Sequence, residues 1–449
     1  MKAVILAAGD GTRLRPYTND RPKPLVRLLG LTLVERVLLA AKKAGVRDFV
    51  VVLGYKGELI RKRLGDGSRY GVRIEYVTNE HWEKGNGSSL LAAEKALRGE
   101  KQFLTLMADH IVDPEVIRCA LRHASASDDC LLCVDRDLES IVDPDDATKV
   151  RTEGGRAVAI GKQIRKYDAV DTGVFVFSPI IFDALRRAQK GGRVGLTDGV
   201  REVVKENRLR IVEISGLFWI DVDSLQALLA AEARLLRSLK KKSDGIISRW
   251  INRPISTRLT RWLVDFPVSP DFVTMVSFLI AVASGVLFAV GQLLVAGVLA
   301  QVASIVDGVD GEIARLKFCE TRFGAFVDSL LDRYADVAIV LGMSAWAFEA
   351  TGHPWILFLG MLVLAGAPLS MLAKEKYRSI TGRAYPVDEA EGWMRFVPDS
   401  RDARLFIIML GGITGLIIPT LAILAALTHG KALWRLYRMA DLLDVPVVR

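Results

Sequence analysis

The feature that most constrains this chain is a long stretch without any charged residue, from Phe272 to Val306. A membrane-spanning helix needs roughly 20 apolar residues, so the stretch is long enough for about two spans. Gly291-Gln292 offers a turn inside it, and we predict a hairpin of helices near 272–290 and 293–316. The hydrophobic content of 51% agrees with a chain that is partly embedded in a membrane.

Further apolar segments follow this hairpin and extend the membrane part. They lie near residues 323–347, 354–373, 403–418 and 420–440, which makes about six transmembrane helices. Lys and Arg cluster before the first helix and in alternate connections, whereas the connections near Gly291, Pro354 and Pro419 have almost none. The positive-inside rule therefore predicts a multi-pass protein of the cell membrane with both termini in the cytoplasm.

Four aspartates lie inside or beside these apolar segments, where an ionised side chain is costly unless it is compensated. Asp307 and Asp310 are three residues apart at the end of one predicted helix, and Asp328 and Asp332 are four apart on the next. Four carboxylates on adjoining helices suit hard divalent cations, and we predict two Mg²⁺ ions there.

Two other interpretations of the four aspartates stay open. One is structural pairing with the neighbouring arginines Arg315, Arg322 and Arg333, although the four aspartates outnumber the arginines that can point inward. The other is the proton relay of a transporter, which explains neither the glycines between the aspartates nor the polar N-terminal half.

The spacing of this region resembles a known family. The pattern Asp307-x2-Asp310-Gly311-x2-Ala314-Arg315-x8-Gly324-x3-Asp328-x3-Asp332 is similar to the CDP-alcohol phosphotransferase signature at every fixed position, within a resemblance that covers about residues 246–440. The resemblance implies that the four aspartates bind the metals and that Asp332 is also the general base on the acceptor hydroxyl. It further implies a CDP pocket lined by Gly311, Ala314, Arg315 and Gly324.

A basic loop follows in the same region. Its arginines are candidates for binding the phosphate of the acceptor, and they are Arg378, Arg383, Arg401 and Arg404. The same arginines are equally well explained as anchors of membrane topology.

The N-terminal part begins with an apolar strand that leads directly into a glycine loop. Ala3 to Ala7 predicts the strand, and Ala8-Gly9-Asp10-Gly11-Thr12-Arg13 follows at once. Glycines let backbone N–H groups approach phosphate oxygens, and Arg13 and Lys23 supply positive charge, so this stretch predicts a polyphosphate site.

Strands and helices then alternate along the N-terminal half. We predict strands at 49–54, 73–77, 103–107, 131–134 and 174–177, with helices such as 33–44 and 88–97 between them. This order indicates a Rossmann-like α/β domain with a mostly parallel sheet, whose ligands collect at the carboxyl ends of the strands. Asp109 and Asp223 follow two strands and are candidates to hold Mg²⁺ against a triphosphate, although turns alone also favour Asp at strand ends.

Several segments of this half, taken in order, resemble the sugar-phosphate nucleotidyltransferase family over roughly residues 1–235. They are Leu6 to Leu14 with Lys23-Pro24-Leu25, Gly85-Asn86-Gly87-Ser88, Ala108-Asp109, Asp171 to Phe175 and Trp219 to Asp223. By this resemblance the phosphates of the NTP contact Leu6, Ala8, Gly9, Gly11, Thr12, Arg13 and Lys23, the last two with catalytic roles. The base and sugar are bordered by Gly85, Asn86, Gly87 and Ser88.

The resemblance also implies that Asp109 and Asp223 bind Mg²⁺, with Asp221 as an alternative to Asp223. Lys162 or Lys166 is a candidate for the phosphate of the acceptor, although the segment from 161 to 166 can equally be a solvated face.

The composition changes between the two halves, after a helical pattern from Leu225 to Leu239. Lys240 to Gly245 is basic, and Ile246 to Phe266 mixes Trp and Arg as an interfacial amphipathic helix does, or as a plain interdomain helix can. We therefore predict a nucleotidyltransferase domain at 1–238, a linker with an interfacial helix at 239–268 and a membrane domain at 269–449.

The fusion of these halves predicts two consecutive reactions. It resembles an arrangement in which the first half makes CDP-inositol from CTP and inositol 1-phosphate, and the second transfers phosphoinositol to another inositol 1-phosphate. Both active sites then face the cytoplasm, with membrane lipid around the helices, no nucleic acid partner and room for a homodimer through the membrane domain. Two alternatives are another phospho-alcohol that ends in a lipid, and an inactive, nucleotide-binding regulatory first half.

Overall fold

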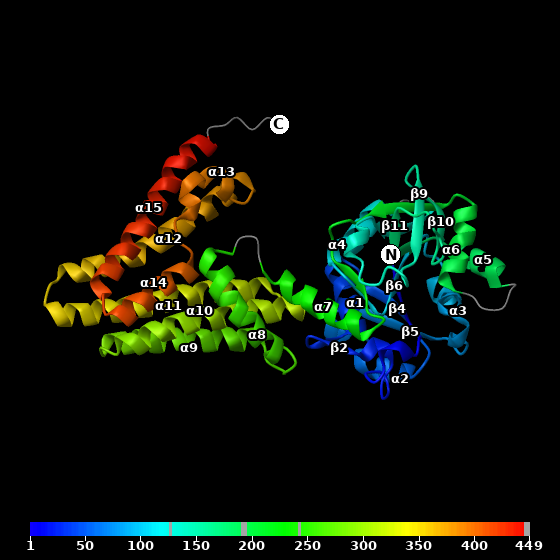
Figure 1. Ribbon diagram of the computed structural model, residues 1–449, viewed down its shortest axis with the longest axis horizontal. Helices are drawn as coiled ribbons and strands as arrows, with labels where there is room; N and C mark the ends of the chain where they lie inside the picture. Colours follow the sequence, from blue (N-terminus) through cyan, green and yellow to red (C-terminus); the bar gives the residue numbers. More distant parts are fainter. Residues whose placement is uncertain (125–127, 190–194, 241–243, 444–449) are drawn as a thin grey trace. The chain divides into compact units, whose positions relative to one another are not determined.

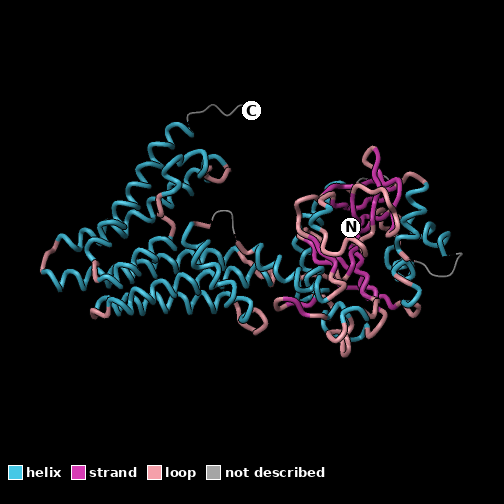
Figure 2. The backbone as a smooth tube through the Cα atoms, in the orientation of Figure 1, coloured by secondary structure: helices cyan, strands magenta, loops and turns pink. Residues whose placement is uncertain are grey.

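The computed structural model describes residues 1–124, 128–189, 195–240 and 244–443 of the chain. It divides into two compact units, Met1–Leu235 and Leu236–Arg449, which we describe separately (Figure 1). Figure 2 shows that the described strands belong to the first unit, whereas the second consists of helices and loops. Lys241, Lys242 and Ser243 of the predicted basic linker lie outside the described residues.

A nine-stranded sheet forms the centre of the described first unit, in the order β5-β4-β1-β6-β11-β8-β12-β10-β9. These strands are β1 (Ala3–Ala7), β4 (Asp48–Leu53), β5 (Arg73–Thr78), β6 (Phe103–Met107), β8 (Cys130–Asp135), β9 (Lys149–Glu153), β10 (Arg156–Gly161), β11 (Ala169–Phe177) and β12 (Leu209–Glu213). The strand β1, which lies between β4 and β6, is buried at every position, so its carboxyl end delivers the glycine loop from the core of the unit.

The prediction of a mostly parallel sheet holds for only part of it. The strands β5, β4, β1 and β6 are parallel neighbours, and β8 is parallel to β12. However, β11 pairs antiparallel with both β6 and β8, and β10 pairs antiparallel with β12 and β9. The sheet is therefore mixed, because the chain runs back through β9 and β10 to insert β11 beside β6.

Helices cover both faces of this sheet (Figure 1). Within the unit, α1 packs on α4, and α3, α5 and α6 form a second group. Their bounds are α1 (Leu33–Lys43), α2 (Gly57–Leu64), α3 (Asn86–Ala92), α4 (Pro114–His123), α5 (Ile180–Ala188), α6 (Leu196–Lys205) and α7 (Leu225–Ser238). Two-stranded pairs are formed by β2 (Arg27–Leu28) with β3 (Leu31–Thr32) and by β7 (His110–Val112) with β13 (Trp219–Asp221).

The pair β7–β13 matters for the site, because it joins two segments that are far apart in the sequence. His110 lies opposite Asp221 in its register, and the backbone N–H of Val222 donates to the carbonyl of Asp109 at 3.1 Å. The acidic residues predicted at two different strand ends are thereby held next to each other.

The regular elements described in the second unit are all helices, and loops connect them. Its helices are α8 (Arg253–Leu263), α9 (Pro270–Ala289), α10 (Leu293–Leu316), α11 (Arg322–Thr351), α12 (Trp355–Thr381), α13 (Val387–Glu391), α14 (Arg401–Thr414) and α15 (Ile417–Leu443). The predicted hairpin is confirmed as α9 and α10, and the turn between them has Gly291 at φ 79°, a conformation that favours glycine.

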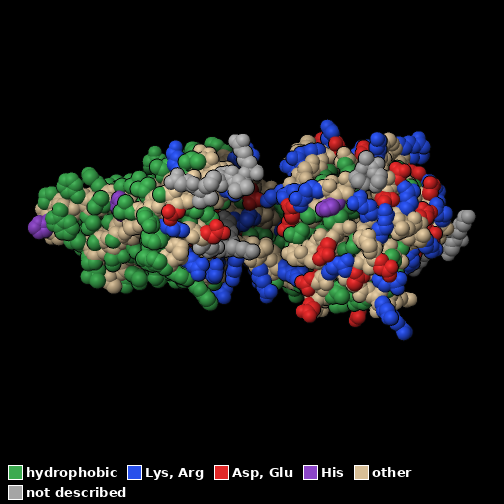
Figure 3. Space-filling view, turned by 90° about the horizontal axis from the view of Figure 1, so that it is seen from above, with side chains coloured by type: hydrophobic (Ala, Val, Ile, Leu, Met, Phe, Trp, Pro, Cys, Tyr) green, Lys and Arg blue, Asp and Glu red, His purple; other side chains and the backbone are tan. Residues whose placement is uncertain are grey.

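The predicted count of about six spans is not confirmed. Among the described helices, α9, α10, α12 and α15 are long and apolar enough to cross a membrane. The helix α11 has 30 residues but contains several charged side chains, and α14 has only 14 residues. Hydrophobic side chains cover much of the visible surface of the second unit (Figure 3). Together with the four long apolar helices, this surface is that of a membrane protein.

Glycines let the membrane helices approach each other closely. A Cβ atom added to Gly342 of α11 would lie 1.9 Å from the carbonyl oxygen of Gly285 on α9, and one added to Gly412 of α14 would lie 2.5 Å from that of Leu293 on α10. Small residues of this kind allow helix backbones to pack tightly in a membrane. The packing fixes α10 and α11, which contain the four aspartates, on the same scaffold.

Candidate functional site

The glycine loop of the first unit brings Lys23 to the end of β1. Gly11 has φ 66°, and a Cβ atom added there would lie 2.3 Å from Cβ of Lys23. A side chain at this position would therefore collide with the lysine as well as strain the backbone. At Gly9, in contrast, nothing lies within 4 Å of an added Cβ, so the loop backbone is open to a ligand.

The ammonium group of Lys23 is surrounded by the three predicted acidic residues. Its Nζ lies 2.5 Å from Asp109 Oδ2 and 3.8 Å from Asp221 Oδ1, and it is also bonded to Asp223. The lysine side chain is only 9% exposed. The sequence left Asp221 and Asp223 as alternatives, and the structure brings both to the same cation.

Charges close to these groups shift their pKa values in opposite directions. Burial alone lowers the pKa of Lys23, but Asp109, Asp221 and Asp223 outweigh it and raise that pKa above its usual range. Burial raises the pKa of Asp109, but Lys23 and His110 outweigh it and lower that pKa. For Asp221, burial together with Asp109 and Asp223 raises the pKa to about 6. Asp109 and Asp221 therefore differ in proton affinity although both lie beside Lys23.

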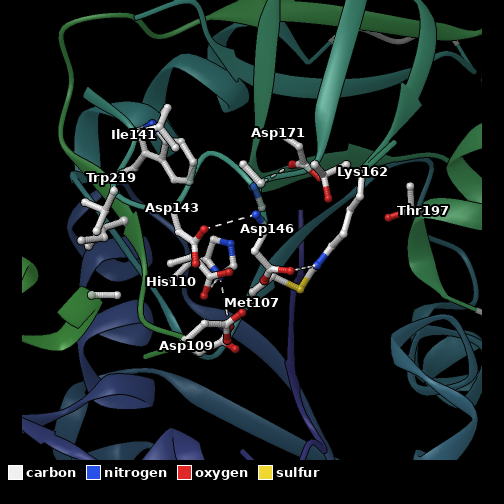
Figure 4. Close-up of a pocket in the computed structure, with 18 of the residues that line it drawn as sticks. Met107, Asp109, His110, Ile141, Asp143, Asp146, Lys162, Asp171, Thr197 and Trp219 are labelled. Atoms are coloured by element: carbon white, nitrogen blue, oxygen red, sulfur yellow. Dashed lines mark hydrogen bonds and ion pairs between the residues drawn. The ribbon is translucent and has the colours of Figure 1, made fainter. Parts of the chain in front are cut away.

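Two adjoining cavities meet at this cluster. The smaller, of about 170 Å³, is lined by the glycine loop and Lys23, and the larger, of about 340 Å³, extends toward the residues shown in Figure 4. Five residues line both cavities, and they are Arg13, Asn86, Met107, Asp109 and Asp223. A nucleotide phosphate in the first cavity and an acceptor in the second would meet at this shared wall.

The larger cavity contains a carboxylate that the sequence analysis missed. Asp146 Oδ2 lies 2.7 Å from Arg13 Nη1, and its other oxygen is bonded to Lys162. Burial raises the pKa of Asp146, but the hydrogen bonds from Lys162 and Arg13 outweigh it and lower the pKa to about 2. Asp146 lies in a loop without a motif, and nothing in the sequence marks it. Lys162 lines the cavity as predicted, whereas Lys166 is exposed and is not among the lining residues.

Several other residues of the larger cavity are polar or aromatic. His110 stacks on Trp219 with ring centroids 6.5 Å apart, and its Nδ1 lies 3.0 Å from Asp109 Oδ1. Asp171 accepts a hydrogen bond from the backbone N–H of Gly173, and burial raises the pKa of Asp171 to about 6. His110 directly follows Asp109 in the sequence, so its place beside the predicted segment Ala108-Asp109 was a signal that it belongs to the site.

The predicted segment from Gly85 to Ser88 is only partly at the cavities. Asn86 lines both of them. The hydroxyl of Ser88 instead donates to the carbonyl oxygens of Gly85 and His81, inside the fold. Leu6, Gly9, Gly11 and Thr12 line the smaller cavity, whereas Ala8 is not among its lining residues, and their contact with phosphates stays a prediction.

The donor set of the first unit fits a divalent cation. One ligand atom each from Asp109, His110 and Asp221 lies within 4.8 Å of the others, and Asp223 lies beside them on Lys23. Oxygen-rich sites of this kind suit Mg²⁺ and similar hard ions. Lys23 neutralises the same carboxylates and would share them with an ion.

Replacing Lys23 by methionine is expected to destabilise the first unit by about 3 kcal/mol in a chelating buffer, because it leaves buried carboxylates without their cation. Thermal unfolding of the full chain with and without a divalent cation measures the effect. The divalent cation is expected to reduce the difference in unfolding temperature between Lys23→Met and wild type, because it binds the same carboxylates. The exposed Lys62→Met is the control. A Lys23→Met protein as stable as this control would contradict the arrangement.

The second unit has its own group of carboxylates. Oxygens of Asp307 on α10 and of Asp328 and Asp332 on α11 lie within 4.8 Å of one another. The predicted approach of the two aspartate pairs is therefore observed for three of the four. The fourth, Asp310, accepts hydrogen bonds from Thr274 Oγ1 of α9 and from the backbone N–H of Gly311.

Arg401 is the cation that compensates this cluster. Its Nη1 lies 2.6 Å from Asp332 Oδ1 and 3.1 Å from Asp307 Oδ2, and its Nε lies 3.2 Å from Asp336 Oδ1. Of the three arginines considered from the sequence as partners of the aspartates, Arg333 pairs with Asp336 at 3.3 Å. Arg401 was a candidate from the sequence for binding the phosphate of the acceptor. It lies at the site, where it pairs with the carboxylates.

Asp336 is a fifth acidic residue that the sequence analysis missed. It lies one helical turn after Asp332, so the row Asp328, Asp332 and Asp336 was visible as a four-residue repeat. Arg404 Nη2 binds it at 2.9 Å, which makes Arg404 part of this ion-pair network. Arg378 is exposed on α12, and the described contacts do not link it to the acidic cluster.

Two basic residues of the C-terminal helix are buried in ion pairs and are not surface charges. Lys431 Nζ lies 2.8 Å from Glu391 Oε2, and Arg435 Nη2 lies 2.7 Å from Glu391 Oε1. All three side chains are buried. They tie α13 to α15 and contribute no exposed positive charge.

One carboxylate site lies at the glycine loop of the α/β unit, and the other lies on α10 and α11 of the helical unit. Together they define a nucleotidyltransferase fused to a CDP-alcohol phosphotransferase. Residues 2–142 match the nucleotidyl transferase family, and residues 267–431 match the CDP-alcohol phosphatidyltransferase family. Enzymes of both families generally use divalent metal ions, with small-molecule nucleotide and sugar-phosphate substrates.

Relatives with the same two parts match nearly the whole chain. The bifunctional IPC transferase and DIPP synthase of Aquifex aeolicus is 35% identical over 97% of this chain and 97% of the relative. The protein of the same name from Rubrobacter xylanophilus is 38% identical over 97% and 95%, respectively. The chain therefore belongs to the family of bifunctional IPC transferases and DIPP synthases.

Among solved structures, the inositol-1-phosphate CTP transferase from T. maritima is similar to the chain. It is 27% identical, with a TM-score of 0.46, and the match covers 51% of this chain and 94% of that one.

Proposed function

We propose that this chain makes CDP-inositol from CTP and inositol 1-phosphate in its first unit, with release of pyrophosphate. Its second unit transfers the phosphoinositol group of CDP-inositol to another inositol 1-phosphate, giving di-inositol phosphate phosphate and CMP. The observation that carries the proposal is the presence in one chain of two separate carboxylate sites, one at the glycine loop and one on α10 and α11. Relatives aligned over 97% of this chain are named for both activities.

In the first step, the phosphate of inositol 1-phosphate attacks the α-phosphorus of CTP. The glycine loop offers backbone N–H groups to the triphosphate, and Lys23 and Arg13 lie where they neutralise its charge. Lys162, in the larger cavity, orients the phosphate of the acceptor. Both Arg13 and Lys162 are bonded to Asp146, so a phosphate would compete with Asp146 for them.

In the second step, the hydroxyl of an acceptor inositol 1-phosphate attacks the β-phosphorus of CDP-inositol. Asp332 takes the hydroxyl proton, and Asp307 and Asp328 have carboxylate oxygens within 4.8 Å of it. Arg315 contacts the diphosphate, since it lies one helical turn after Gly311 on α10. Arg401 lies where it binds a phosphate once metal ions neutralise Asp307 and Asp332.

We propose Mg²⁺ for both sites, with two ions in the second. Asp109, Asp221 and Asp223 would hold it in the first unit, and Asp307, Asp310, Asp328 and Asp332 in the second. Bound Mg²⁺ supplies charge stabilisation at the phosphoryl oxygens and lowers repulsion between substrate and carboxylates.

We further propose that both sites face the cytoplasm. The proposal is supported by the connections 290–292, 352–354 and 415–416, which have no Lys or Arg, and by the opposite helix ends, where Lys317, Arg322, Lys374 and Arg378 lie. The segment at 239–268 is proposed as an interfacial linker, supported by Trp250 and Trp262, which are 76% and 64% exposed. Contact with lipid and a homodimer through the second unit stay predictions.

The function is tested by supplying membranes that contain the full chain with CTP, Mg²⁺ and radiolabelled inositol 1-phosphate. We expect the label to pass through CDP-inositol into a water-soluble product that organic solvent does not extract. Label in the organic phase would show that the acceptor is a lipid precursor and would overturn the assignment of the acceptor. Absence of pyrophosphate would overturn the first step.

A further inference from the structure

Glu312 is a buried carboxylate of α10 that the proposed mechanism does not use. Its side chain is 0% exposed, and all of its described hydrogen bonds come from α8. Arg253 Nη1 and Ser256 Oγ each donate to Oε1 at 2.7 Å, and Thr260 Oγ1 donates to Oε2 at 2.6 Å. Both oxygens of Glu312 therefore accept hydrogen bonds from α8, the helix inside the predicted linker.

Arg253 is itself fixed by a second carboxylate. Its Nε lies 3.0 Å from Asp244 Oδ2, and its Nη2 lies 3.2 Å from Asp244 Oδ1. It also packs on α10 beside Gly308, where an added Cβ would lie 3.5 Å from Arg253 Nη1. The guanidinium thus bridges Asp244 and Glu312.

This arrangement has a consequence for Arg315, one helical turn after Glu312. Glutamate and arginine three residues apart on a helix ordinarily pair with each other. In this chain Nε and Nη2 of Arg315 are buried and have no hydrogen-bond partner among the described residues. Its Nη1 lies 3.2 Å from a Cβ atom added at Gly311, next to Asp310. Arg315 is therefore a cation with unused donors, one helical turn after Gly311 on α10, while Glu312 is bonded to α8.

We propose that Arg253 is a positioning residue, which holds Glu312 on α8 so that Arg315 stays available to a phosphate of the CDP-alcohol. The inference rests on the proposed function of the second unit and deepens it. Without Arg253, Glu312 is expected to turn toward Arg315 and to compete with the diphosphate for its guanidinium. The linker helix α8 thereby acts on nucleotide binding without touching the nucleotide.

The test measures the second step with the full chain in detergent, with CDP-inositol, inositol 1-phosphate and Mg²⁺. Arg253→Met is expected to raise KM for CDP-inositol about tenfold with little change in kcat, which corresponds to the loss of one charge-assisted hydrogen bond. Glu312→Gln alone should keep KM within about threefold of wild type, because Arg315 remains unpaired. The double variant Arg253→Met/Glu312→Gln should recover this lower KM, since a neutral side chain cannot neutralise Arg315. The exposed Arg258→Met on the same helix is the control.

A merely structural role of Arg253 predicts a different pattern, in which the double variant is as impaired as Arg253→Met or worse. That result, or an unchanged KM in Arg253→Met, would overturn the proposal. If Arg253→Met does not fold, Arg253→Lys replaces it and should shift KM in the same direction by less, because lysine reaches only one carboxylate. Failure of the proposed function is distinguishable, because the wild-type chain would then consume no CDP-inositol.

Discussion

Replacing Asp328 by asparagine is expected to stop the second reaction while leaving pyrophosphate release intact. Asp328 has an oxygen within 4.8 Å of ligand atoms of Asp307 and Asp332, so the change removes one negative charge from the centre of the proposed cation site. Metal ions and fixed charges at phosphoryl centres account for large parts of a rate enhancement, and we expect a loss of about a thousandfold or more. The isosteric side chain keeps the packing of α11.

The measurement supplies CDP-inositol and inositol 1-phosphate directly and follows release of CMP. Glu349→Gln is a matched control, because it removes one negative charge from the exposed far end of the same helix. It should retain wild-type rates in both reactions. An Asp328→Asn protein that still releases CMP at rates near wild type would show that the carboxylates of α10 and α11 are not the reaction centre.

Asp109→Asn is expected to have the reciprocal effect and to stop only the first reaction. Asp109 lies on the wall shared by the two cavities, and its carboxylate contacts both Lys23 and His110. Removing its charge weakens a proposed cation ligand where the α-phosphorus would lie, so pyrophosphate release should fall by about a thousandfold.

CMP release from supplied CDP-inositol should be unchanged in Asp109→Asn. Glu58→Gln is the control, since this side chain is 81% exposed on α2. If Asp109→Asn also abolished the second reaction, the two sites would not be independent, and the division of labour between the units would be wrong.

Local signals in the sequence were sufficient for much of the scaffold. The uncharged stretch divided by Gly291 predicted α9 and α10 almost to the residue, because apolar length and a turn glycine determine such a hairpin. The strand β6 was predicted at 103–107 as observed, and α1 begins at Leu33, as predicted, with Thr32 as the N-cap of a capping box. The approach of Asp109 and Asp223 followed from their places at strand ends.

Pairings between distant segments could not be predicted in the same way. The antiparallel β11 enters between β6 and β8 after a long excursion of the chain, and no local pattern specifies its neighbours. Asp146 comes from a loop, yet it binds both Arg13 and Lys162. Likewise, Arg401 was visible only as one arginine of a basic loop, and its position among Asp307, Asp332 and Asp336 depends on the packing of α14 on α10.

The most direct test of the account follows both leaving groups in one reaction. Phosphorus NMR of the wild-type chain in membranes, with CTP, Mg²⁺ and excess inositol 1-phosphate, resolves pyrophosphate, CDP-inositol and CMP. We predict that CDP-inositol rises and then decays, and that pyrophosphate and CMP reach equal amounts at completion. Pyrophosphate that accumulates with CDP-inositol but without CMP would contradict the claim that one chain catalyses two consecutive steps.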